Sequence, residues 1–86
     1  MRGASLEKTD FSAAALVGVD LRGARLDDAD FTNAVLAGAD LRGCRLDGTN
    51  FMRADLRGAE LRGTDTTDGD FTDALIADAI GFAADE

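Results

Sequence analysis

Large side chains recur at every fifth position along almost the whole chain, and all but one of them are apolar. The positions are Leu6, Phe11, Leu16, Leu21, Leu26, Phe31, Leu36, Leu41, Leu46, Phe51, Leu56, Leu61, Thr66, Phe71 and Ile76. A series of mostly small residues lies two positions earlier and runs from Ala4 to Ala74. A period of five fits neither an α-helix nor a long alternating strand. Two positions is the spacing of side chains on one face of a strand, so each five-residue unit is predicted to be a very short strand followed by a corner.

A second, longer period sets the predicted cross-section. Among the central positions Phe occurs only at Phe11, Phe31, Phe51 and Phe71, which are 20 residues apart. If four units make one turn, these rings lie above one another on a single side. The pattern therefore predicts a four-sided β-helix of about four 20-residue coils, separated by roughly 4.8 Å.

Residues at the corners indicate the turn type. Gly ends the unit at 18, 38 and 58 and again at 23, 43 and 63. A type II turn favours Gly because its third residue has a positive φ. Two corners of each coil are therefore predicted to be type II turns. The other two corners are expected to use a different or mixed type, and they carry Lys8, Asp28, Gly48 and Asp68, or Ala13, Asn33, Arg53 and Asp73.

Two units, Ala39-Asp40-Leu41-Arg42-Gly43 and Ala54-Asp55-Leu56-Arg57-Gly58, match the pattern A-(D/N)-L-x-x nearly verbatim. The chain thus resembles the pentapeptide-repeat family, and the resemblance covers about residues 4–76. It implies an all-β fold, a right-handed quadrilateral β-helix, with the central and small residues inside.

The repeat becomes irregular near residue 64, and the segment after Phe71 has two interpretations. It continues the repeat through Ile76, or Thr72 or Asp73 begins a short amphipathic helix that caps the rod. We expect the β-helix to occupy residues 1–76 and a cap or tail to occupy 77–86. Open β-helix ends are sheet edges and invite association. A homodimer through one end is therefore expected, and the candidate contacts are Leu75, Ile76, Ile80 and Phe82.

The charge balance narrows the range of partners. The formal net charge is −8, from 9 Lys and Arg against 17 Asp and Glu. Direct binding of nucleic acid or of an anionic membrane is not expected, because phosphates require basic side chains to replace their counterions. The chain shows no signal-peptide pattern and no run of about 20 apolar residues, so a cytoplasmic location is expected.

Residues suited to catalysis are scarce. The chain has no His, and no Ser or Cys nucleophile lies beside a base. No calcium-binding spacing occurs among the Asp residues. Cys44 occupies a small-residue position, which favours a buried structural role over a redox or metal-binding thiol. We expect a protein that is not an enzyme and needs no cofactor or metal.

Residues on either side of each centre are predicted to point outward and to form columns. One face carries Asp20, Asp40 and Glu60 beside Arg22, Arg42 and Arg62, and the next carries Arg25 and Arg45 beside Asp27 and Asp47. On the face centred on the Phe residues, the column before each centre is Asp10, Asp30, Asn50 and Asp70. This column has little basic compensation, so it is the candidate docking strip for a basic surface. A further face, expected opposite the Phe residues, is apolar outside: Ala15, Val17, Val35, Ala37 and Leu75.

Two functions are consistent with these surfaces. The first is a protein-interaction or scaffolding module built on a rigid rod, with an unidentified protein partner. The second rests on the resemblance: some pentapeptide-repeat proteins mimic duplex DNA, bind DNA gyrase and related topoisomerases, and modulate quinolone sensitivity. The acidic charge favours the mimic, whereas the short rod and the Arg columns disfavour it.

Overall fold

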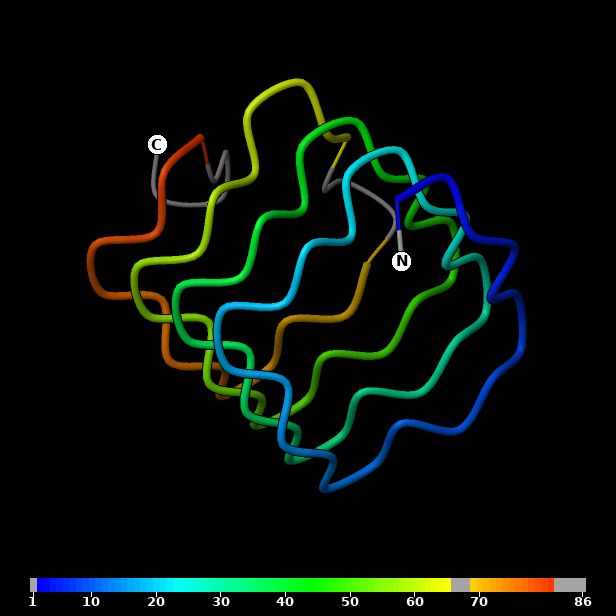
Figure 1. Cartoon of the computed structure of the whole chain (residues 1–86). Coiled ribbons are helices and arrows are strands. Elements are labelled where there is room, and N and C mark those ends of the chain that lie inside the picture. The colour runs from blue at the N-terminus through cyan, green and yellow to red at the C-terminus, as the bar shows by residue number, and fades with distance from the viewer. Residues whose placement is uncertain (1, 66–68, 82–86) are drawn as a thin grey trace.

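The chain winds into a β-helix whose turns are 20 residues long. The computed structural model describes residues 2–65 and 69–81. Parallel β-bridges join each outward position to the one a full turn later, as at Asp10 to Asp30 and Ala15 to Val35. Figure 1 shows the resulting stack of coils. Within the described ranges there is no helix. The β-structure there consists of isolated bridges of one residue each, and no strand extends over several residues.

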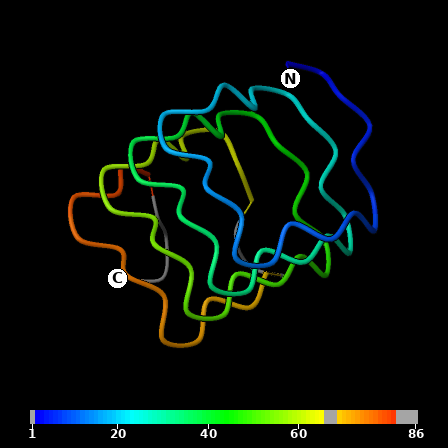
Figure 2. The ribbon, with the colours of Figure 1, turned by 60° about the horizontal axis from the view of Figure 1, so that its bottom comes forward.

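Backbone hydrogen bonds between successive coils hold this register. The N–H of Leu16 donates to the carbonyl of Val35 at 2.7 Å, and the N–H of Val35 donates to the carbonyl of Ala14 at 2.9 Å. Partners are therefore 19 or 21 residues apart along the chain. Each coil contacts only its neighbours, as in other solenoids. The first and last coils lie at opposite ends of the stack (Figure 2).

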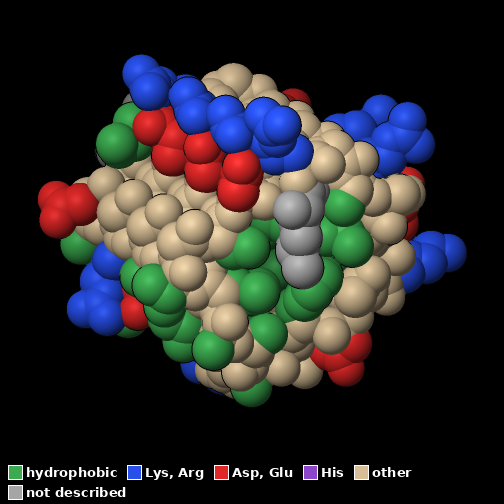
Figure 3. All heavy atoms as spheres, in the orientation of Figure 1, with side chains coloured by type: hydrophobic (Ala, Val, Ile, Leu, Met, Phe, Trp, Pro, Cys, Tyr) green, Lys and Arg blue, Asp and Glu red, His purple; other side chains and the backbone are tan. Residues whose placement is uncertain are grey.

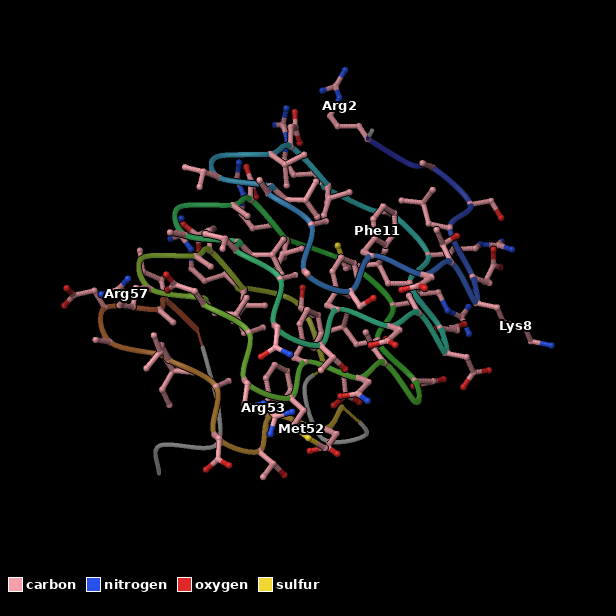
Figure 4. The ribbon with its side chains drawn as sticks, turned by 90° about the horizontal axis from the view of Figure 1, so that it is seen from below. Arg2, Lys8, Phe11, Met52, Arg53 and Arg57 are labelled. Atoms are coloured by element: carbon pink, nitrogen blue, oxygen red, sulfur yellow. The ribbon has the colours of Figure 1, made fainter. Side chains whose placement is uncertain are left out.

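The interior contains the two series of residues that the sequence predicts to be inside. Side chains from Leu21 to Leu61 at these positions are almost completely buried, including Phe31 and Phe51 with no exposed area. The four Phe rings stack with centroids 4.9 to 5.0 Å apart and planes 6 to 9° from parallel. Phe11 points into the coil, whereas Met52, Arg53 and Arg57 point outward (Figure 4). The core is thus a set of ladders of like side chains.

The prediction of mixed corner types is wrong. Every described corner has a positive φ at its third residue, and this includes Lys8 at 61°, Ala13 at 59° and Arg53 at 58°. These corners therefore share the type II signature of the Gly corners. The reason is that corners are hydrogen-bonded to one another: the N–H of Ala13 donates to the carbonyl of Thr32 at 2.8 Å. Register between coils thus imposes one turn geometry even on residues that disfavour it.

After Phe71 the chain continues the repeat and forms no helix within residues 71–81. Bridges join Asp55 to Leu75 and Glu60 to Ile80, so the repeat geometry reaches beyond position 76. The irregular Gly69 has a steric reason, because a Cβ there would lie 2.8 Å from the Phe71 ring. Thr66, the exception in the central series, and residues 82–86 lie outside the described residues. No helix in the described part of the chain is long and apolar enough to cross a membrane.

The rod has four sides, which we name by their residues. In chain order they are the mixed face, centred on Leu6, Leu26 and Leu46; the phenylalanine face, centred on Phe11, Phe31, Phe51 and Phe71; the apolar face, centred on Leu16, Leu36, Leu56 and Ile76; and the arginine face, centred on Leu21, Leu41 and Leu61. The apolar face follows the phenylalanine face directly, so the expectation that these two are opposite is wrong. The arginine face lies opposite the phenylalanine face.

Candidate interaction surfaces

The predicted acidic column exists as one continuous feature of the phenylalanine face. Bridges join Asp10 to Asp30, Asp30 to Asn50 and Asn50 to Asp70. Asp10 and Asp70 are exposed, and Asp30 and Asn50 are half-buried. The structure therefore brings all four candidate residues together, one per coil.

The side chains of this column are held in place by the residues two positions later. The N–H and hydroxyl of Ser12 donate to Asp10 Oδ1 at 2.9 and 2.6 Å, and those of Thr32 donate to Asp30 Oδ1 at the same distances. Thr72 binds Asp70 Oδ1 in the same way, at 3.0 and 2.6 Å. The amide of Asn50 takes the carboxylate's place, and its Oδ1 accepts the N–H of Met52 at 2.9 Å. The column is therefore preorganised.

These hydrogen bonds also lower the pKa values of the carboxyl groups at the two ends of the column. The hydroxyl of Ser12 and then its backbone N–H lower the pKa of Asp10, and Thr72 lowers the pKa of Asp70 for the same reasons. A donor stabilises the charged carboxylate and not the protonated acid. Both groups are therefore negatively charged at neutral pH.

No ion pair within residues 2–65 and 69–81 involves a carboxylate of this column. Arg53, at the adjoining corner, donates from Nε to Asn33 Oδ1 of the coil before it, at 3.3 Å. The negative charge of the column is thus uncompensated by any salt bridge in the described structure.

The arginine face has the opposite character, because each of its carboxylates is paired. Arg42 donates to both oxygens of Asp40, with Nη2 to Oδ2 at 2.7 Å, and Arg22 also contacts Asp40 from the neighbouring coil at 3.6 Å. Arg62 pairs with Glu60 at 2.7 Å. Figure 3 shows a basic row beside an acidic row on the surface, as such pairing requires. Paired columns of this kind favour solubility more than recognition.

On the mixed face the arginine and carboxylate groups are paired at longer distances. Arg25 lies 3.9 Å from Glu7, and Arg45 lies 3.6 Å from Asp27. Both arginine side chains are 60% exposed, so these contacts contribute little stability.

Residues proposed for end-to-end association do not form one surface. Leu75 points outward on the apolar face and is 51% exposed, and Ile80 points outward on the next face and is 48% exposed. Ile76 instead packs against the core. Phe82 lies outside the described residues. Association through one end of the rod therefore stays a prediction.

Buried polar groups serve the fold. Thr49 donates its hydroxyl to the carbonyl of Leu26 at 2.6 Å, and the Cys44 thiol lies 2.9 Å from the carbonyl of Leu21. Burial raises the pKa of the Cys44 thiol to about 11, which keeps it protonated and unreactive. Within the described part of the chain, no His, Cys, Asp or Glu side chains form a group of three suited to a metal ion.

The fold and its repeat define a class of protein. The family model for pentapeptide repeats matches residues 1–33 and 29–68, in 8 copies, and the chain therefore belongs to the pentapeptide-repeat family. Its fold is the family's right-handed quadrilateral β-helix. No curated protein matches the chain.

Solved structures of known proteins are similar to this chain. Alr5209, a pentapeptide repeat protein from Nostoc PCC 7120, is 33% identical with a TM-score of 0.84, over 87% of this chain and 62% of that one. AT2G44920, a pentapeptide repeat protein from the Arabidopsis thaliana thylakoid lumen, is 29% identical with a TM-score of 0.57, over 98% of this chain and 72% of that one. QnrB1, a plasmid-mediated fluoroquinolone resistance protein, shares the fold at 23% identity and a TM-score of 0.50, over 91% of this chain and 46% of that one.

Sequence reasoning missed the hydroxyl donors that fix the acidic column. The signal was present as the spacing Asp-x-Ser or Asp-x-Thr, which occurs around Phe11, Phe31 and Phe71. It also missed the ion pair of Asp55 with Arg57, at 2.8 Å, in the middle of the apolar face.

Proposed function

We propose that the chain is a non-enzymatic protein-interaction module whose phenylalanine face docks on a basic surface of a partner protein. The observation that carries this proposal is the column of Asp10, Asp30, Asn50 and Asp70. Its carboxylates make no ion pair in the described structure, and their orientations are held by Ser and Thr donors.

A preorganised column suits recognition for two reasons. Side chains that are already ordered lose little conformational entropy when a partner binds. Charges repeated along a rigid surface at about 4.8 Å steer a basic partner and fix its register more than they add affinity. The arginine face lacks this capacity, because its carboxylates are already neutralised by neighbouring guanidinium groups.

A second candidate function is the acidic DNA mimic that binds DNA gyrase or a related topoisomerase and modulates quinolone sensitivity. The same acidic column favours it. The dimensions of the rod weigh against it, because its longest extent is 29 Å. At 3.4 Å per base pair this length corresponds to about eight base pairs of duplex. A single copy would therefore cover a short stretch of a DNA-binding channel.

The proposal is tested with a neutralised column. The variant Asp10→Asn, Asp30→Asn and Asp70→Asn removes three charges, and the natural Asn50 shows that an amide keeps the local hydrogen bond. A matched control, Asp28→Asn, Asp47→Asn and Asp78→Asn, removes three charges elsewhere. Wild type and both variants serve as baits for affinity capture, with captured proteins quantified by mass spectrometry.

Wild type and control are expected to retain the same basic protein, and the column variant is expected to lose it at least tenfold. Equal capture by all three baits would contradict the proposal. The same three proteins are titrated into a gyrase supercoiling assay with and without a quinolone. Inhibition or drug protection that the column variant lacks would favour the DNA mimic, and no effect would exclude it.

A further inference from the structure

The outward residues of the apolar face form apolar pairs as well as one ion pair, whereas those of the arginine face form ion pairs at Asp20, Asp40 and Glu60. In each coil two side chains point outward, one on either side of the centre. The pairs are Ala15 with Val17, Val35 with Ala37, Asp55 with Arg57, and Leu75 with Ala77. Each pair thus combines a small residue with a large apolar one, or an acid with a base.

These pairs form two columns along the rod. Bridges join Ala15 to Val35, Val35 to Asp55 and Asp55 to Leu75. In the second column, the carbonyls of Ala37, Arg57 and Ala77 accept hydrogen bonds from the Gly corners of the preceding coils. The columns therefore run parallel on either side of a line over Leu16, Leu36, Leu56 and Ile76.

Part of this face is unusually exposed for apolar residues. Val17 is 68% exposed and Leu75 is 51% exposed, and they belong to the same face at opposite ends of the rod. The corners on one edge, Gly18, Gly38 and Gly58, carry no side chain, so a flat surface can approach them. Apolar side chains this exposed along one face indicate a contact surface.

We propose that the apolar face binds the same face of a second copy, with the two rods side by side and parallel. The twofold axis would run along the rods, above the line of centres. Rotation about this axis places each column of one copy over the other column of its partner. Val17 then faces Ala15, Val35 faces Ala37, and Leu75 faces Ala77. Asp55 faces Arg57, and the same contact occurs twice by symmetry.

The antiparallel arrangement lacks this complementarity. A twofold axis perpendicular to the rods keeps each column over itself. It places Asp55 over another Asp55 or over Val35, and Arg57 over another Arg57 or over Ala37. The first placement sets like charges over one another, and the second sets each charged side chain against an apolar one, so neither adds an ion pair between copies to the one inside each chain. The charge pattern therefore selects the parallel dimer.

Asp55 and Arg57 also determine which coils lie at the same height. Within one chain Arg57 binds Asp55 through Nε at 2.9 Å and Nη2 at 2.8 Å. The arginine side chain is 58% exposed, so its guanidinium has free donors for a second carboxylate. A slip by one coil would bury this ion pair against Val35 and Ala37 or against Leu75 and Ala77. The ion pair thus determines which coils of the two copies face each other, and the apolar pairs provide the contact area.

The size of the face predicts a reversible dimer. The three extents of the molecule are similar, at 29, 24 and 23 Å. One of the four sides of so small a molecule gives an interface at or below the lower limit of about 1,000 Å² in total for specific interfaces. We therefore expect a dissociation constant in the micromolar range.

The experiment is a charge exchange followed by mixing. Arg57→Asp gives one copy two acids at this coil, and Asp55→Arg gives another copy two bases. Each variant alone should repel itself, while the mixture should restore both ion pairs. Sedimentation equilibrium from micromolar to millimolar concentration measures the mass, and circular dichroism checks that each variant folds. The monomer mass is 9.0 kDa.

The proposal predicts that wild type dimerises, that each variant alone binds itself at least tenfold more weakly, and that the mixture dimerises like wild type. If a charge variant fails to fold, Val17→Lys, at an exposed position, is expected to abolish the dimer. The matched control pair, Arg42→Asp and Asp40→Arg on the arginine face, should leave the mass unchanged. Ile80→Lys should also leave it unchanged, whereas association through the end of the rod would be weakened.

Three results would overturn the proposal: a wild type that remains monomeric at millimolar concentration, a dimer that ignores both charge variants, or charge variants that do not recover on mixing. The acidic column plays no part in this contact. The variant neutralised at Asp10, Asp30 and Asp70 should dimerise normally, so failure of one proposal leaves the other intact.

Discussion

Replacement of Phe31 by Ala should cost far more stability than the same change at Phe11. Phe31 has no exposed area and stacks on two rings, with centroids at 4.9 and 5.0 Å. Truncation of a buried Phe to Ala costs about 3–5 kcal/mol. Phe11 is half-buried in the first coil and stacks on Phe31 alone among the described rings, so its truncation should cost about 2 kcal/mol.

The assay is urea unfolding followed by far-ultraviolet circular dichroism, because the chain has no Trp or Tyr for fluorescence. A domain of 86 residues has a total unfolding free energy of about 4–13 kcal/mol. Phe31→Ala can therefore unfold the protein outright. Phe31→Leu keeps most of the volume and should cost about 1.5 kcal/mol or less, which provides a measurable variant.

These magnitudes follow if the stacked interior provides most of the stability and each coil depends on its neighbours. Equal losses for Phe11→Ala and Phe31→Ala would refute this condition, because burial and stacking differ between the two positions. A loss below about 1 kcal/mol for Phe31→Ala would refute it as well, since so small a loss is incompatible with a fully buried ring.

Ala13→Gly should stabilise the fold by about 1 kcal/mol, because Ala13 has a φ of 59°. Ala77→Gly is the control at a corner residue without positive φ, and it should destabilise the fold by about 0.5–1 kcal/mol. Urea unfolding measures both changes. Cys44 should react with a thiol reagent at pH 8 only after unfolding, because burial raises its pKa to about 11; rapid labelling of the folded protein would contradict its burial. The hydrogen bond from Arg42 lowers the pKa of Asp40 in the folded state, so its stabilising contribution is complete above about pH 4 and is lost as the pH falls further. Melting temperatures between pH 5 and pH 2 should therefore fall less for Asp40→Asn than for wild type.

The sequence predicted the interior well because the inward positions obey a strict rule. A narrow β-helix has room for one large and one small side chain per unit. The burial of Leu36 and Ala34 is therefore predicted by their spacing alone. The column of Asp10, Asp30, Asn50 and Asp70 followed from the same register. Once the turn length is known, every outward column is determined.

The corners could not be predicted in the same way. Local preference assigns positive φ to Gly and disfavours it at Lys8 and Ala13 by roughly 1–2 kcal/mol per residue. Hydrogen bonds between neighbouring corners overrule that preference, and they depend on the whole stack rather than on the local sequence. The segment after Phe71 shows the same effect. Its apolar residues do have the spacing of an amphipathic helix. However, the preceding coil has backbone N–H and carbonyl groups that pair with this segment, and a helix would leave them unpaired.

The 20-residue turn underlies every surface described above, and through-hydrogen-bond couplings measure it most directly. In a long-range HNCO experiment on uniformly labelled protein, the N–H of Leu36 should couple to the carbonyl of Asp55, where the distance is 2.7 Å, and the N–H of Val35 to that of Ala14. Couplings between residues 19 and 21 apart, repeated from coil to coil, are the predicted result. Couplings across three residues within a corner are also expected, as from the N–H of Ala39 to the carbonyl of Leu36. Couplings between coils at separations other than 19 and 21, or none between coils in the folded protein, would contradict the register and with it both proposed contact surfaces.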